Sequence, residues 1–144
     1  MKLVFAMVPL FLICLLGAFG LYGVSAYEGQ VTAVVVETPT AIYQRITAEQ
    51  AKAKMDTGEQ YVLLDVRTEE EFNESRIDGA ILIPFDEIMD RAESELPDKN
   101  VLILVYCRSG RRSANAANEL VAMGYTNVYD FGGIIDWPYD TAGR

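Results

Sequence analysis

The chain has 144 residues, of which 51% are hydrophobic, so it can form one domain with a substantial core and still keep a separate N-terminal segment. Its formal net charge of −9 argues against binding to nucleic acid or to anionic membranes through the overall charge. The absence of histidine excludes Cys-His and Ser-His-Asp catalysis and any metal site with histidine ligands. Of the two cysteines, only Cys107 lies outside the apolar N-terminal segment, so no C-x-x-C motif is available for zinc or dithiol chemistry.

The first 26 residues predict an export signal. Lys2 is followed by an uncharged apolar run that ends in Val24-Ser25-Ala26, which is the layout of a signal peptide cleaved after Ala26. The run is also long enough for an N-terminal membrane anchor, since about 20 residues span a bilayer, and this alternative stays open. Because Lys2 should remain inside, both interpretations place the rest of the chain outside the cytoplasm, as in a periplasmic protein.

Residues 27–40 are interpreted as a spacer, and the folded domain is expected in residues 41–144. Within that domain, apolar runs and helix signals alternate along the chain. The predicted elements, in chain order, are a strand at 42–46, a helix at 47–55, a strand at 61–66, a helix at 69–73, a strand at 81–83, a helix at 86–94, a strand at 101–107, a helix at 114–123, a strand at 127–129, a turn at 132–133 and a helical turn at 134–137. This order predicts an α/β fold in which helices cover both faces of a parallel sheet.

Two of these helices carry a capping box at their start. The pairs are Thr47 with Gln50 and Thr68 with Glu71, and in each the two side chains can satisfy the first backbone N–H groups of the helix. The two boxes therefore mark where these helices begin.

The strand at 101–107 is the most apolar of the set, and it ends at Cys107. Parallel α/β sheets bind their ligands beyond the carboxyl ends of the strands. The loop that follows Cys107 is therefore expected to be the functional site.

This loop combines Cys107 with three arginines, Arg108, Arg111 and Arg112. A tight turn from a strand into a helix directs several backbone N–H groups into one concavity, where the helix dipole also favours anions. Gly110 supplies the backbone freedom for such a turn. We therefore expect the pKa of Cys107 to lie well below the free value of about 8.5. A thiolate in this setting suits attack on a small, doubly charged oxyanion, either thiosulfate or a phosphate or arsenate ester.

The stretch Cys107-Arg108-Ser109-Gly110-Arg111-Arg112-Ser113 resembles the active-site loop of the rhodanese (sulfurtransferase) family. The resemblance extends to further stretches, at 63–67 with 69–72, at 76–80 with 83–84, and at 123–125 with 132–133 and Trp137. It implies a five-stranded parallel α/β sheet and a family in which single-domain, exported members occur. One departure is Arg76, which stands where the family has a histidine regarded as structural and puts the local packing in question.

The same family contains phosphatases and arsenate reductases, whose loop is one residue longer and places an arginine sixth after the cysteine. Here Arg112 is the fifth residue after Cys107 and Ser113 is the sixth. The loop thus has the shorter, sulfur-transferring length. A phosphatase or arsenate reductase, and a non-catalytic persulfide carrier or binding module, remain the alternatives.

The resemblance also implies a role for each site residue. Cys107 would be the nucleophile that takes sulfur from thiosulfate or a polysulfide and passes it, as a persulfide, to cyanide or a thiol, with no metal or organic cofactor. The residues expected to bind the substrate are Arg108, Ser109, Gly110, Arg111 and Arg112, and those expected to support the site are Asp65, Arg67 and Ser113. Asp65 and Arg67 are interpreted as a structural pair at a strand end, and Trp137 as a core or rim residue.

Overall fold

The computed structural model describes residues 42–143. The predicted export signal at 1–26 and the predicted spacer at 27–40 lie outside the described residues. None of the helices in residues 42–143 combines the length and the apolar character that a membrane span needs.

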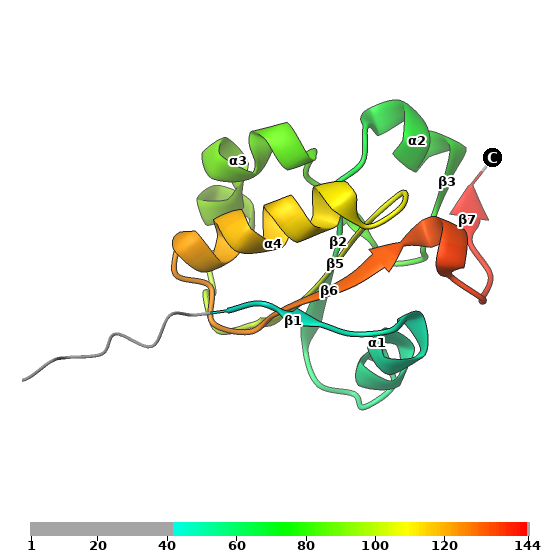
Figure 1. Ribbon diagram of the computed structural model, residues 1–144, viewed down its shortest axis with the longest axis horizontal. Coiled ribbons are helices and arrows are strands. Elements are labelled where there is room, and N and C mark those ends of the chain that lie inside the picture. Colours follow the sequence, from blue (N-terminus) through cyan, green and yellow to red (C-terminus); the bar gives the residue numbers. More distant parts are fainter. Residues whose placement is uncertain (1–41, 144) are drawn as a thin grey trace, which may run out of the picture. The chain divides into compact units, whose positions relative to one another are not determined.

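Five parallel strands form the central sheet, in the order β1-β6-β5-β2-β4 (Figure 1). The strands are β1 Gln44–Arg45, β2 Tyr61–Asp65, β4 Ile81–Leu82, β5 Leu102–Cys107 and β6 Val128–Gly133. The predicted α/β fold with a five-stranded parallel sheet is confirmed. Because β5 lies in the middle, every one of its residues is buried.

Helices cover the sheet on both sides, with α3 and α4 on one side and α1 on the other (Figure 1). The helices are α1 Ala48–Met55, α2 Glu69–Glu74, α3 Ile88–Glu95 and α4 Arg111–Ala122, and the 3₁₀ turns are η1 Phe85–Glu87 and η2 Ile134–Asp136. A hydrophobic core lies on each side of the sheet, and alternate residues of β5 point into one or the other. Ile103 and Val105 pack with α3 and α4. Leu104 and Tyr106 pack with α1. Both predicted capping boxes are formed, at Thr47 and at Thr68.

The end of β6 differs from the prediction. The turn expected at Gly132 and Gly133 is wrong, because β6 continues through both glycines and Gly133 pairs with Cys107 across a register shift. A Cβ atom on Gly133 would lie 2.7 Å from the Cα of Ser109, so only glycine lets β6 approach the loop this closely. The two glycines therefore form the wall against which the loop packs.

Two further differences concern the edges of the fold. Helix α4 begins at Arg111 rather than at residue 114, so Arg111 and Arg112 belong to its first turn. A second small sheet pairs β3 Ser75–Arg76 with β7 Ala142–Gly143 in antiparallel fashion, and the sequence did not predict it. Strands of two residues carry too little alternation to be recognised from their pattern.

Candidate active site

Cys107 is the last residue of β5, and only 1% of its surface is exposed. The chain turns sharply after it, since Gly110 adopts a φ of 98° and caps the start of α4. This turn brings the backbone N–H of Gly110 to 3.1 Å from Sγ of Cys107, where it donates a hydrogen bond to the sulfur. The sulfur thus lies at the carboxyl end of the central strand and at the beginning of a helix, where a negative charge is favoured.

The pKa of Cys107 is lowered from its ordinary value, as the balance of opposing effects shows. Burial is the largest single effect and acts to raise the pKa of the thiol. The hydroxyl of Ser113 and the backbone N–H groups of Ser113, Gly110 and Ser109 together outweigh it and lower the pKa. The expected direction is therefore found, but hydrogen bonds from the loop contribute more to it than the arginines that the sequence emphasised.

Ser113 is fully buried and ties the loop to β6. Its Oγ lies 3.1 Å from the carbonyl oxygen of Gly110 and 3.2 Å from that of Gly132. A hydroxyl has one proton, so a hydrogen bond from Ser113 to the Cys107 thiolate would compete with both of these. The N–H of Gly110, which has a direct contact with the sulfur, is the firmer activating donor.

Arg112 is held by a carboxylate that the sequence did not assign to the site. Its Nη1 and Nη2 donate to Oε2 and Oε1 of Glu71 at 2.7 and 2.8 Å, a bidentate ion pair in which both side chains are largely buried. This contact lowers the pKa of Glu71 to about 2 and is the main reason that the pKa of Arg112 is raised. Oε2 of Glu71 also accepts the N–H of Thr68, so one carboxylate joins the starts of α2 and α4. The sequence had marked Glu71 only through the capping box and through the family resemblance at 69–72, without a role at the site.

The other residues expected to bind substrate are differently placed. Arg108, Ser109 and Arg111 are exposed, and within the described residues neither arginine forms an ion pair or a side-chain hydrogen bond. Gly110 is buried against the guanidinium of Arg45, whose Nη2 would lie 3.2 Å from a Cβ at position 110. Of the three arginines that follow Cys107, two are thus exposed without a partner in the described residues, and the third is paired with Glu71.

Asp65 and Arg67 form a buried ion pair at the end of β2. Nη2 of Arg67 donates to Oδ2 of Asp65 at 2.6 Å and to the carbonyl oxygen of Ser75 at the same distance. The pair thus connects β2 to β3. Arg76, the departure from the family pattern, lies with its guanidinium 5.0 Å from the centre of the Phe72 ring, so it packs against α2.

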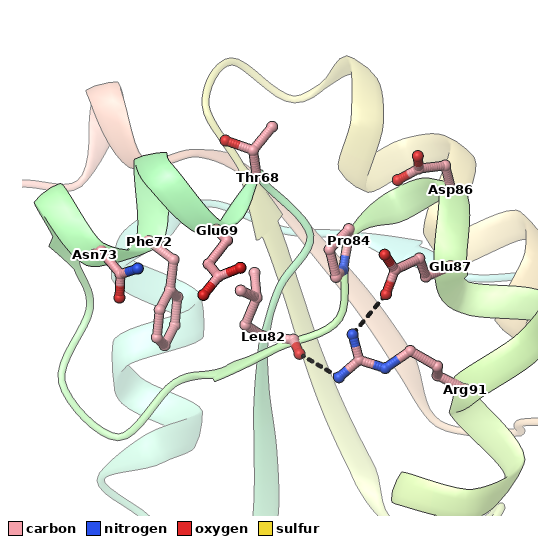
Figure 2. A pocket seen from close by; sticks show the side chains of 9 residues that line it. All are labelled: Thr68, Glu69, Phe72, Asn73, Leu82, Pro84, Asp86, Glu87 and Arg91. Atoms are coloured by element: carbon pink, nitrogen blue, oxygen red, sulfur yellow. Dashed lines mark hydrogen bonds and ion pairs between the residues drawn. The ribbon is translucent and has the colours of Figure 1, made fainter.

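A cavity of about 610 Å³ opens on another part of the surface, between α2 and α3. Figure 2 shows the side chains that line it, which are Thr68, Glu69, Phe72, Asn73, Leu82, Pro84, Asp86, Glu87 and Arg91. Its one guanidinium, that of Arg91, is bound by Glu87 and by the carbonyl oxygen of Leu82. With carboxylates on its wall and no residue of the Cys107 loop, this cavity does not suit a dianionic sulfur donor.

The chain matches the rhodanese-like domain family over residues 47–138, and it belongs to that family. It is 42% identical to a thiosulfate sulfurtransferase, PspE of Escherichia coli, over 51% of this chain and 70% of that protein. It is 33% identical to thiosulfate sulfurtransferase 18 of Arabidopsis thaliana, over 61% of this chain and 72% of that protein. A solved structure described as rhodanese with anions from E. coli superimposes with a TM-score of 0.56 at 36% identity, covering 59% of this chain and all of that one.

Proposed function

We propose that the chain is a sulfurtransferase that carries a sulfane sulfur on Cys107 as a persulfide. The proposal rests on the surroundings of the Cys107 sulfur, which is buried at the start of α4 and accepts a hydrogen bond from the N–H of Gly110. The pKa of the Cys107 thiol is lowered there. Relatives named thiosulfate sulfurtransferases support the same chemistry. Thiosulfate or a polysulfide would be the donor, and cyanide or a thiol the acceptor.

In the first step, the Cys107 thiolate attacks the outer sulfur of thiosulfate. The S–S bond of thiosulfate breaks, its electron pair leaves with sulfite, and Cys107 keeps the transferred sulfur as a persulfide anion. Arg108 and Arg111 are exposed residues of the turn that follows Cys107, and their charge would attract the dianionic donor. The backbone N–H groups at the start of α4 would stabilise the negative charge on the persulfide.

In the second step, cyanide or a thiolate attacks the outer sulfur of the persulfide. The S–S bond breaks, its electron pair returns to Sγ of Cys107, and the acceptor leaves as thiocyanate or as a new persulfide. Charge and electrons balance in both steps, so neither an oxidant nor a cofactor is required.

The loop length favours this chemistry over phosphoryl or arsenate chemistry. Gly110 already caps α4, and Arg112 lies in the first helical turn with its guanidinium held by Glu71. The loop between the sulfur and the helix is thus short, which supports a small donor rather than a larger tetrahedral ester. Steady-state turnover of thiosulfate and of an aryl phosphate separates the sulfurtransferase from the phosphatase.

The purified protein and its Cys107→Ser variant should be assayed for thiocyanate formation from thiosulfate and cyanide, and in parallel for hydrolysis of an aryl phosphate. We expect thiocyanate formation by the wild type alone and no phosphate release by either protein. Full thiocyanate turnover by Cys107→Ser, or phosphate release faster than thiosulfate consumption, would contradict the proposal. If Cys107 forms a persulfide but no acceptor supports turnover, the result would favour a non-catalytic persulfide carrier.

We also propose that the domain works outside the cytoplasm, either as a soluble protein or held by an N-terminal anchor. The support is the sequence layout of Lys2 and the apolar run that ends at Ala26. Fractionation of the producing cells with N-terminal sequencing of the product tests this. A product that starts at Tyr27 in the exported fraction supports cleavage, an intact product in the membrane fraction supports the anchor, and an intact product in the cytoplasmic fraction would contradict both.

A further inference from the structure

The basic side chains of the described residues fall into two groups. Most have a partner of their own. Lys52, Arg67, Arg91, Lys99 and Arg112 pair with carboxylates, while Lys54 and Arg76 lie over aromatic rings. Three have no such partner within residues 42–143, namely Arg45, Arg108 and Arg111. These three arginines are therefore the basic side chains of the described residues with neither a carboxylate nor an aromatic partner, in a chain with a net charge of −9.

All three of these arginines border the Cys107 loop. Arg108 lies in the loop and Arg111 begins α4. Arg45 comes from the distant strand β1, yet its Nη2 would lie 3.2 Å from a Cβ on Gly110 and 3.9 Å from one on Gly132. These three arginines therefore come from the Cys107 loop, from the first residue of α4 and from a strand whose arginine reaches Gly110.

An exposed aliphatic side chain lies beside these charges. Ile135, in η2, is 64% exposed, and its N–H donates to the carbonyl oxygen of Arg108 at 3.3 Å. A single exposed isoleucine needs no explanation by itself. Here it flanks the loop directly, and we name Arg45, Arg108, Arg111 and Ile135 the docking rim.

We propose that the docking rim binds an acidic and partly apolar segment of an acceptor protein, which presents a cysteine thiol to the Cys107 persulfide. This inference rests on the proposed function and names the acceptor's class. A small thiol or cyanide has no use for an aliphatic contact, whereas a protein segment with Glu or Asp next to Leu or Val complements both parts of the rim.

The surroundings of the rim would also orient such a partner. Glu69, Glu70 and Glu74 on α2 line a neighbouring acidic surface, and Glu71 joins that helix to the start of α4. An acidic segment is repelled there and attracted to the rim, so the field of the domain favours one direction of approach. Interfaces of this kind are weak and transient, which suits a partner that must leave after each transfer.

The transfer itself follows the second step described above. The thiolate of the acceptor cysteine attacks the outer sulfur, the S–S bond breaks, and the electron pair returns to Cys107 as the acceptor becomes a persulfide. Nothing is oxidised or reduced overall, so the rim has only to bring the two sulfur atoms together.

The test uses the full-length protein, loaded with thiosulfate and freed of excess donor, and two peptides that each contain one cysteine. In one peptide Glu and Leu flank the cysteine, and in the other Lys replaces Glu. Rates are divided by the thiolate concentration of each peptide, because the flanking charges change the pKa of its cysteine. At low salt we expect the acidic peptide to react about tenfold faster, with the ratio falling towards one near 0.5 M salt, roughly as screening of rim charges requires.

Two variants with matched controls assign the effect to the rim. Ile135→Ser should slow transfer to the acidic peptide about threefold while leaving the cyanide rate unchanged, as expected for loss of a partly buried aliphatic contact. Met89→Ser, at a side chain 61% exposed on α3, is its control and should change neither rate. Arg45→Gln should slow the acidic peptide and weaken its salt dependence, whereas Lys54→Gln should do neither.

The outcomes separate this inference from the proposed function. Failure of the protein to take up sulfur or to form thiocyanate would refute the proposed function and the rim with it. Normal thiocyanate formation with equal rates for the two peptides at low salt would refute the rim alone. The rim is also refuted if Ile135→Ser behaves as Met89→Ser does.

Discussion

Replacing Glu71 by glutamine removes the carboxylate that holds Arg112 while keeping the shape of the side chain. The pKa of Glu71 is about 2 in the folded protein and 4.5 ordinarily, which corresponds to about 3–4 kcal/mol at about 1.4 kcal/mol per pKa unit. Arg112 and Glu71 are 17% and 24% exposed, so solvent screening reduces the expected loss to about 1–2 kcal/mol. We therefore expect Glu71→Gln to lower the free energy of unfolding by this amount at pH 7.

The stability lost in Glu71→Gln should depend on pH, in a direction set by the lowered pKa of Glu71. A carboxylate whose pKa is lowered by folding stabilises the folded state above its unfolded pKa and loses that contribution as the pH falls through its folded pKa. The difference between wild type and Glu71→Gln should therefore be complete above about pH 5 and shrink steadily between about 4.5 and about 2.

Urea unfolding at a series of pH values, followed by circular dichroism, measures this difference. The matched control is Glu70→Gln, on the same helix but with an exposed side chain and no arginine partner within the described residues. A loss at pH 3 as large as that at pH 7, or a loss no greater than that of the control, would refute the assignment of Glu71 as the anchor of Arg112.

Three further predictions follow from the site. Ser113→Ala should raise the pKa of Cys107, seen as a shift of the pH profile of alkylation by iodoacetamide to higher pH, and an unchanged profile would remove Ser113 from the activation of the thiol. Gly133→Ala should destabilise the fold by about 2–3 kcal/mol in urea unfolding, because the new methyl group meets the backbone of the loop, and a wild-type midpoint would contradict that packing. Asp65→Ala should cost about 3–5 kcal/mol by leaving Arg67 buried and unpaired, and part of this loss should be recovered when Arg67 is replaced by methionine as well.

The parts of the fold that the sequence predicted are those with local signals. The capping box of Thr47 and Gln50 acts across three residues, so its spacing alone marks the start of α1. The apolar strand that ends at Cys107 and the loop after it are likewise continuous in the chain. This is why the position of the sulfur at the carboxyl end of the central strand could be predicted.

The features that the sequence did not predict depend on contacts between distant residues. The pairing of Arg112 with Glu71 needs the starts of α2 and α4 to meet, and the reach of Arg45 to Gly110 needs β1 to lie beside β6. Neither contact leaves a spacing pattern in the chain. A pair of glycines ordinarily indicates a turn, whereas Gly133 serves here to let two backbones pass closely.

The most direct test of the proposed chemistry is the mass of the protein after incubation with thiosulfate. We expect one added sulfur atom, located by peptide mapping on Cys107 and removed by cyanide, and no addition after prior alkylation of that residue. Sulfur added to Cys14, sulfur retained by the Cys107→Ser variant, or no addition at all would contradict the assignment of Cys107 as the sulfur carrier.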